Sequence, residues 1–433
     1  MTARTRRRRF SRFLGAALLA MIAIPLAAAE DAGPFESDGP QQEKIEMRLW
    51  RDNFLSRSVG TDDDRIHAYA GELLILDDNV YLRDRDEEHD AVQVRFAGLD
   101  MRLEREETYR LGLAAETRYY DYHRLSDENH SEYDLKPSFE YIFNDMLKLK
   151  MSGRLAKSVS PIDLTTVDRI ESHSANGDFQ VSITPTDLWG VDLKWRIKDK
   201  EYDVSQYRRL DHQENAWTLA PFYMVTDKLK VGVELTWGDV DYDKDIHNNA
   251  DYWEMRLAGT YAPDDKWLFY LSLGYQDRDY DHQGPTYALV GEEVPVLTLI
   301  DSGSNPDRTE FDGLVFTGSA LYKYSEKWTF GLSAARMPLE SSAGNFYAFN
   351  RFSIHAAYLP IDPLKLSAEL FNEYVDESNT KDSDRFGLST AVTWSFSEWA
   401  GVGASYQYKR KYSDDPNGEY VNNVATLGVW FTF

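Results

Sequence analysis

Hydrophobic and polar residues alternate with a period of two along most of the chain after residue 65. In the stretch KWLFYLSLGYQ, for example, Trp267, Leu271 and Tyr275 share one face of an extended chain, and Ser272 and Gly274 share the other. A period of two is that of a β-strand whose two faces meet different surroundings. No helical period is sustained over the same region, so the alternation predicts an all-β fold.

Two classes of connection alternate between the predicted strands. Short turns are predicted at residues 106–107, 144–145, 185–187, 226–227, 263–265, 325–326, 360–363 and 397–398. Longer, charged connections such as HRLSDENHSE and DESNTKDSD separate the hairpins that these turns form. Eight hairpins account for sixteen strands, and one further strand at each end brings the predicted number to eighteen.

Many amphipathic hairpins occur in soluble propellers and sandwiches as well as in membrane barrels. The soluble folds have loops of comparable length at both ends. A transmembrane barrel instead combines short periplasmic turns with long extracellular loops, an apolar outer face and aromatic girdles. Because this chain has both loop classes and aromatic residues at the ends of its apolar faces, we predict a transmembrane antiparallel up-and-down β-barrel over residues 65–433.

The chain ends on NNVATLGVWFTF, in which Leu427, Val429, Phe431 and Phe433 belong to one apolar row. A sheet in hydrocarbon must close without a free edge, so the last strand is expected to pair with the first, near residues 66–76. Val429, Phe431 and Phe433 also resemble the carboxy-terminal assembly signal of bacterial outer-membrane proteins. That resemblance implies recognition by the barrel-assembly machinery.

Residues 1–29 have the composition of a secretory signal peptide. Six arginines precede the apolar run LGAALLAMIAIPLAAA, and Ala27 and Ala29 offer a cleavage site. The run is shorter than the ~20 apolar residues of a spanning helix, which argues against an uncleaved anchor. We predict cleavage near Ala29, localisation in the outer membrane of a Gram-negative bacterium, and a periplasmic segment over residues 30–64 that forms a helix, a plug or a further strand.

Composition excludes several other classes of protein. The chain has no cysteine, which excludes a disulfide framework, c-type haem attachment and thiolate metal sites. Its formal net charge is -25, and removal of the six signal arginines takes it to -25 - 6 = -31. So acidic a chain is not expected to bind nucleic acid, and no cofactor is expected.

The predicted lumen is lined by every second residue of each strand, and these inward rows contain many cations. The basic residues predicted to line the lumen are Arg110, Arg118, Lys148, Lys150, Arg154, Lys194, Arg196, Lys198, Lys230, Arg256, Arg351, Lys365 and Arg385. The clearest inward acids are Glu116, Glu140, Asp192, Glu234, Glu254 and Glu369. A basic interior would favour anionic solutes or uronic-acid-containing chains. The alternative is that cations and acids pair across neighbouring strands and only rigidify the barrel.

The predicted loops contain candidate chemistry of lower specificity. Acidic runs such as DVDYDKD offer oxygen ligands for calcium, yet their spacing lacks the glycine and terminal Glu of a calcium loop, so no metal site is expected. The pairs Asp211 with His212 and Asp281 with His282 are adjacent in sequence. Adjacent residues of an extended chain point to opposite faces, and we therefore expect no enzyme activity.

The longest predicted loop, residues 282–308, contains an apolar stretch that a solvated loop would not need. Loops of this length are usually functional. The segment is expected to fold inward as a constriction, to pack across the barrel mouth, or to extend the neighbouring strands.

Two regions carry a more specific resemblance. Residues 72–92 contain the hairpin tip DDNV followed by a charged loop, and residues 384–433 contain a YQY strand, the run KRKYS and the pair EY. The layout resembles that of the outer-membrane β-barrel porin type 2 family. The resemblance implies a role in exopolysaccharide assembly or export and transfers no catalytic residue.

Together these features predict a porin-like conduit for export or passage of an anionic polysaccharide or small anionic solutes. The alternative is a structural or adhesive outer-membrane barrel with a closed lumen. Expected partners are outer-membrane lipid and lipopolysaccharide, the barrel-assembly machinery and polysaccharide export components.

A closed barrel of this kind resists detergent until it is heated. We expect the purified protein to migrate differently on a denaturing gel when boiled and when unheated, because only boiling opens the hydrogen-bonded sheet. Identical migration of the two samples, or a monodisperse protein in detergent-free buffer, would contradict the barrel.

Overall fold

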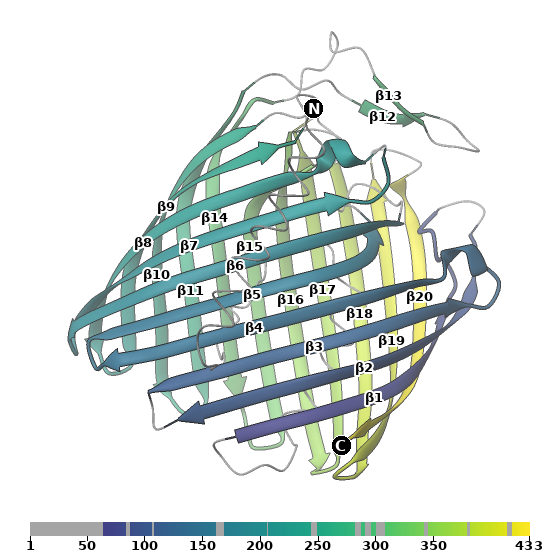
Figure 1. The fold of residues 1–433 in the computed structure, drawn as a ribbon, viewed down its shortest axis with the longest axis horizontal. Coiled ribbons are helices and arrows are strands. Elements are labelled where there is room, and N and C mark those ends of the chain that lie inside the picture. Colours follow the sequence, from purple (N-terminus) through teal and green to yellow (C-terminus); the bar gives the residue numbers. More distant parts are fainter. Residues whose placement is uncertain are drawn as a thin grey trace.

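The computed structural model describes residues 64–433 except 84–86, 106–107, 162–168, 206, 244–248, 282–286, 291–295, 300–307, 342–344, 379–381 and 414–417. In this part of the chain, eighteen strands form one closed antiparallel sheet and two short strands form a separate hairpin (Figure 1). The predicted barrel of eighteen strands is confirmed. The predictions for residues 1–29 and 30–64 lie outside the described residues apart from Asp64, where the first strand begins.

The strands have nearly uniform lengths. Those of the barrel are β1 (Asp64–Asp77), β2 (Asp90–Arg105), β3 (Tyr109–Tyr122), β4 (His130–Asn144), β5 (Leu147–Pro161), β6 (Arg169–Thr186), β7 (Trp189–Tyr202), β8 (His212–Thr226), β9 (Leu229–Tyr242), β10 (Ala250–Asp264), β11 (Trp267–Tyr280), β14 (Glu310–Lys323), β15 (Trp328–Glu340), β16 (Phe346–Ile361), β17 (Leu364–Glu377), β18 (Asp382–Ser397), β19 (Ala400–Ser413) and β20 (Tyr420–Thr432). The separate hairpin and two short 3-10 helices are β12 (Tyr287–Val290), β13 (Val296–Leu299), η1 (Ser126–Glu128) and η2 (Arg208–Leu210).

The barrel closes between its first and last strands, as predicted. Strand β1 pairs with β2 on one side and with β20 on the other, from Tyr69 opposite Thr432 to Asp77 opposite Val424. All eight predicted short turns join neighbouring strands at one end of the barrel, which we call the turn end. Phe433 lies at this end beside β1, and the long connections lie at the opposite loop end (Figure 1).

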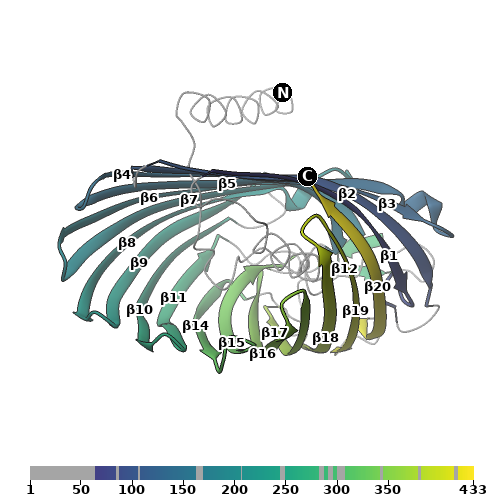
Figure 2. The same ribbon diagram turned by 90° about the horizontal axis from the view of Figure 1, so that it is seen from below.

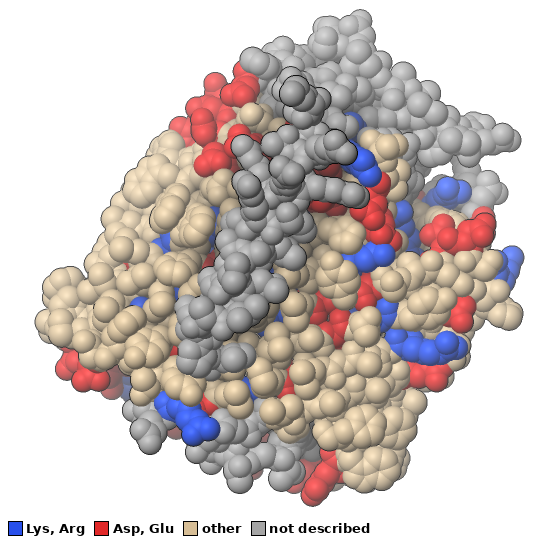
Figure 3. All heavy atoms as spheres, viewed as in Figure 1, with Lys and Arg blue, Asp and Glu red and all other residues tan. Residues whose placement is uncertain are grey.

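The two faces of the sheet differ as the alternation predicts. Leu257, Leu271 and Leu427 are exposed on the outer face, at 63%, 56% and 55%. Their neighbours Ser272 and Thr426 are buried on the inner face. Tan residues accordingly cover most of the visible wall in Figure 3, while acidic residues gather at its upper left edge. An apolar exterior around a polar interior is the arrangement of a barrel that lies in lipid.

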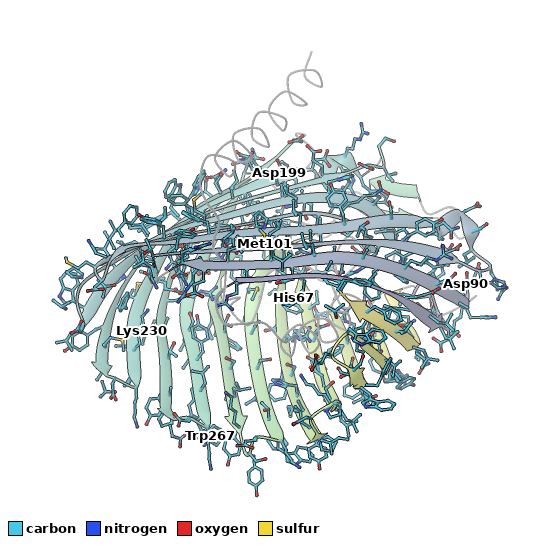
Figure 4. The ribbon with its side chains drawn as sticks, turned by 60° about the horizontal axis from the view of Figure 1, so that its bottom comes forward. His67, Asp90, Met101, Asp199, Lys230 and Trp267 are labelled. Atoms are coloured by element: carbon cyan, nitrogen blue, oxygen red, sulfur yellow. The ribbon has the colours of Figure 1, made fainter. Side chains whose placement is uncertain are left out.

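Aromatic residues mark both edges of the apolar exterior. Near the loop end, Trp195, Trp217, Trp237 and Trp253 lie directly opposite one another on four neighbouring strands. At the turn end Trp267 begins β11, as Figure 4 shows. The outer row of β11 is apolar over eight residue steps, about 27 Å along the strand, which fits the ~25 Å apolar band of outer-membrane barrels once the strand tilts.

In cross-section the barrel is flattened, with a nearly straight wall of β2–β7 facing the curved wall of β14–β18 (Figure 2). Among the described residues, no helix has the length and apolar character needed to cross a membrane.

The segment 282–308 contains a hairpin of its own. Strands β12 and β13 pair with each other, from Tyr287 opposite Leu299 to Val290 opposite Val296. Strands β11 and β14 on either side pair directly. Within the described residues the segment is therefore not a continuation of the neighbouring strand ladders.

One glycine of the inner face permits a contact that spans three strands. Tyr69 of β1 lays its ring across Gly98 of β2 and donates a hydrogen bond from its hydroxyl to Glu116 of β3, at 2.7 Å. A Cβ atom at position 98 would lie 2.3 Å from the Tyr69 ring. Only glycine leaves room for this cross-strand packing.

Replacement of this glycine should destabilise the barrel. We expect Gly98→Ala to lower the free energy of unfolding by about 1–3 kcal/mol, because the Tyr69 ring must leave its site. Urea unfolding in detergent micelles, followed by the heat-dependent gel shift, measures the change. Gly259→Ala is the matched control, since its added Cβ would meet ordinary contacts at 3.4 Å and beyond. Equal loss of stability in both variants would refute the packing argument.

Candidate functional site in the lumen

The thirteen cations predicted to line the lumen lie on the inner face of β3, β5, β7, β9, β10, β16, β17 and β18. They alternate along these strands with the exposed apolar residues of the outer face. Lys230, for example, lies near the turn end in Figure 4, with its ammonium 3.7 Å from the centroid of the Phe222 ring. Their role in solute selection stays a prediction.

One group of these cations is paired with acids and shielded from solvent. Arg154 contacts Asp134 at 3.0 Å and Arg256 contacts Glu254 at 2.6 Å. Arg118 contacts Glu116 and is 10% exposed. Lys198 contacts Glu214 at 3.0 Å. In this group the cations pair with carboxylates on the same or neighbouring strands, which is the arrangement of the structural alternative.

Glu373 on β17 is the centre of the most enclosed cluster. It is 2% exposed, and it contacts Arg351 of β16 at 2.8 Å and accepts a hydrogen bond from Arg385 of β18 at 2.6 Å. Arg351 also contacts Glu369, at 2.9 Å. Three neighbouring strands are thus tied together by one carboxylate whose two oxygens each hold a guanidinium.

A second group of cations remains open to solvent. Arg110, Lys148 and Lys150 are 34%, 38% and 34% exposed, and all three contact Glu140, at 3.6, 3.1 and 3.6 Å. Glu140 itself is only 5% exposed. The carboxylate therefore lies beneath the cations, and the surface that faces the lumen is positive.

The open cations continue across the flat wall to β7. Lys150 lies opposite Gln180 of β6, which lies opposite Lys194 of β7. Lys194 contacts Glu234 at 3.1 Å, and Arg196 contacts Asp178 at 2.9 Å while remaining 52% exposed. The basic panel is defined here as Arg110, Lys148, Lys150, Lys194 and Arg196.

Several residues of the inner face were not identified from the sequence. Glu116 and Glu254 were among the predicted inward acids, but other partners of the shielded cations were missed, because one acid is as easily assigned to a loop as to a lumen when strand ends are unknown. The missed residues are Glu132, Asp134, Asp178, Glu214, Tyr242, Tyr252, Arg278, Glu340, Glu373, Lys409 and Lys411. Alternation in QDRDY would have placed Arg278 inward, but no sequence signal reveals that Glu340 meets it.

The histidines at the loop end have structural neighbours. His130 stacks on Tyr120 at 4.5 Å, and its ring nitrogen lies 2.7 Å from the Glu128 carbonyl oxygen. His212 lies near Tyr242, with its ring nitrogen 2.8 Å from the Leu210 carbonyl oxygen. His282, the histidine of the second Asp–His pair, lies outside the described residues. The expectation of no enzyme activity stays a prediction.

One cluster on the outer side contains metal-ligating groups. Glu171, His173 and Asp203 bring ligand atoms within 4.8 Å of one another. Hydrogen bonding with Glu171 and the neighbouring His173 lower the pKa of the Asp203 carboxyl. Lys157 lies 2.8 Å from Glu171 and already neutralises that carboxylate. The prediction of no metal site is not altered by this cluster.

The predicted assembly signal lies on the outer face of β20 at the turn end. Phe431 and Phe433 are 36% and 79% exposed, and the Phe433 backbone amide donates to the Ala68 carbonyl at 2.7 Å. The terminal residue is therefore tied to β1 while its ring stays accessible. Recognition by the assembly machinery stays a prediction.

Comparisons with known proteins find barrels of similar layout. No protein-family model and no curated protein matches the chain. OccK8 (OprE) of Pseudomonas aeruginosa is 11% identical with a TM-score of 0.44, covering 86% of this chain and 98% of that chain. The loop L8 deletion mutant of OmpT, an outer membrane protein of Vibrio cholerae, is 12% identical with a TM-score of 0.39, covering 86% and 100%. The ferric-catecholate import receptor Fiu of E. coli is 11% identical with a TM-score of 0.40, covering 87% and 82%.

Identities and TM-scores this low carry no argument about the function of this chain. Its own closed sheet, apolar exterior and aromatic edges are those of an outer-membrane β-barrel. That fold implies the outer membrane of a Gram-negative envelope, with the turn end in the periplasm and the loop end outside the cell.

The Glu373 cluster should dominate the stability of its part of the wall. We expect Glu373→Gln to lower the free energy of unfolding by about 3 kcal/mol, because the buried Arg385 guanidinium loses its carboxylate partner and Arg351 keeps only Glu369. Urea unfolding in micelles measures the loss. Glu326→Gln, in an exposed turn, is the control and should change little. A Glu373→Gln protein as stable as the wild type would show that the cluster is dispensable.

Proposed function

We propose that the barrel is a porin-like conduit of the outer membrane for anionic solutes, including acidic polysaccharide chains. One observation carries the proposal: Arg110, Lys148 and Lys150 present their charges to the lumen around a single buried carboxylate, Glu140. A cluster whose cations are exposed and whose acid is covered attracts anions rather than only bracing the wall.

The charge balance of this cluster supports attraction of anions. Arg110 also contacts Glu104, at 2.8 Å, and Arg102 lies 3.8 Å from the same carboxylate, so four cations lie around the two carboxylates Glu104 and Glu140. Low-dielectric walls focus such a field into the lumen and raise the local concentration of counter-ions. Rings of charged side chains give other pores their selectivity in this way.

The spacing of the basic panel supports an extended anion. Lys148 and Lys150 are two residues apart on one face of β5, about 7 Å, and β7 lies about 10 Å away across β6. Between the two cationic strands, β6 contributes Gln180 and Ser182, which can hydrogen-bond hydroxyl groups. A chain of sugars with periodic carboxylates would meet both kinds of group.

The resemblance of residues 72–92 and 384–433 to exopolysaccharide-associated barrels agrees with this substrate class. Export components of a polysaccharide system and the barrel-assembly machinery are the partners that the proposal implies. Secretion after removal of residues 1–29 would bring the chain to the periplasm.

The structural alternative also has an observation in its favour. The shielded cations Arg118, Arg154 and Arg385 are engaged by acids and contribute no free charge to the lumen. If the lumen were closed, the same pairs would serve to fill and stiffen the barrel.

Ion selectivity in a planar bilayer tests the proposal. Under a potassium chloride gradient, the wild type should show a reversal potential of anion preference. Lys148→Glu with Lys150→Glu should shift it towards cations, because two of the three cations around Glu140 are replaced by acids. Lys327→Glu, an equal change of charge in an exposed turn, is the control and should leave the selectivity unchanged.

Cation preference in the wild-type protein would remove the anion conduit. Absence of any conductance would favour the structural barrel. Release of labelled uronic-acid oligosaccharides from proteoliposomes, faster than release of neutral oligosaccharides of equal length, would extend the result from ions to polymers.

A further inference from the structure

The hydrogen-bonded wall is interrupted near the loop end between β14 and β15. These strands pair from Lys323 opposite Thr329 only as far as Phe316 opposite Arg336. The remaining residues 310–315 and 337–340 continue as strands without pairing with each other. On the outer face of β14, the break lies where the apolar Leu314 gives way to the acidic Asp312 and Glu310.

The sequence accounts for the break. If the register of the Phe316–Arg336 pair continued beyond the break, Pro338 would lie opposite Leu314 and Glu340 would lie opposite Asp312. Proline has no amide hydrogen to donate across a ladder, and two facing carboxylates repel. In the structure, the Leu314 carbonyl instead accepts a hydrogen bond from the Arg336 side chain, at 3.2 Å.

Beyond the break, the end of β16 lies inside the wall. Phe346 and Ala348 belong by alternation to the same face as Phe352, which is exposed to lipid. Phe346 is nevertheless only 1% exposed, and its ring centroid lies 5.4 Å from that of Phe311 and 5.6 Å from that of Tyr280. Phe311 and Tyr280 are on the inner face of β14 and β11, so the outer face of β16 covers the inner face of β14 and β11.

The end of β15 is held inside by charge. Glu340 contacts Arg278 of β11 and accepts a hydrogen bond from the Tyr242 hydroxyl of β9, at 2.9 Å. Arg278 is 4% exposed and lies over the Tyr252 ring, 4.5 Å from its centroid. These contacts reach across β14, β11 and β10 to β9, which no residue in the wall plane could do.

We propose that residues 337–340 of β15 and 346–349 of β16 form an inner flap that sets the constriction of the conduit at its extracellular end. The flap consists of strand ends that stay paired with each other and, through β16, with β17, but pass on the lumen side of β14 and fill lumen space in front of β8–β14. Glu340 is its latch and Phe346 its wedge. This inference rests on the proposed conduit function and adds the element that limits passage. The basic panel lies on β3–β7, away from the strands that the flap covers.

Cross-linking tests the position of the flap independently of transport. The chain has no cysteine, so an introduced pair is unambiguous. In intact cells, a short bifunctional thiol reagent should link Phe311→Cys with Phe346→Cys. It should not link Asp312→Cys with Glu340→Cys, which would be neighbours only in an unbroken wall. The heat-dependent gel shift verifies that each variant is folded. Linkage of the second pair and not the first would overturn the flap.

Conductance tests what the flap does. Phe346→Ala and Glu340→Gln should each raise the single-channel conductance at least about twofold, because loss of the wedge or of the latch charge frees lumen space. Phe352→Ala, on the same face of the same strand but in contact with lipid, is the matched control and should conduct as the wild type does.

The possible failures are distinguishable. A conducting wild type with unchanged Phe346→Ala and Glu340→Gln variants overturns the flap as the constriction and leaves the conduit intact. If no form conducts, including both flap variants, the conduit proposal falls and the constriction with it, while the cross-linking pattern still decides whether the strand ends lie inside the wall. Conduction by the variants alone supports the flap as a closure of the lumen.

Discussion

The hydrogen bonds of the backbone constrain this molecule more than any other interaction. Within hydrocarbon an unpaired amide or carbonyl costs several kcal/mol, so each strand needs a partner on both sides. The pairing of β1 with β20 meets this need, down to the Phe433 amide that donates to Ala68. The interrupted ladder between β14 and β15 is compatible with this need for backbone pairing. The break lies where the outward residues of β14 become acidic, at the edge of the apolar layer.

Closure in turn creates an interior that must accept many charged residues. The barrel accommodates these charged residues in two ways. At Glu373 the charges are matched and covered, so that ion pairs replace an apolar core and join three strands. At Glu140 the acid is covered and the cations are left accessible, so that the same chemistry produces a field in the lumen. The difference lies in exposure rather than in residue type.

The wall is also unequal around its circumference. The flat side, β2–β7 (Figure 2), carries the basic panel. The inner face of β8–β14 is covered near the loop end by the strand ends of β15 and β16. This overlap explains why an otherwise polar lumen contains an apolar cluster around Phe346. The cluster is the contact between two layers of sheet. Attraction and constriction are thereby assigned to different parts of the same wall.

The sequence by itself determined the barrel, its eighteen strands, its short turns and the meeting of its two ends. These follow from period-two alternation and turn residues, which are local signals repeated in every hairpin. Alternation also assigned Lys148 and Lys150 to the same face. The solvent exposure of these two side chains, however, depends on residues of the neighbouring strands, which the sequence of one strand does not reveal. Only the tertiary structure decided that Glu140 lies beneath three cations, and that Glu340, on an outward position by register, meets Arg278 on an inward one. Both depend on contacts between residues distant in sequence, and such contacts are fixed by the closed sheet rather than by any segment of it.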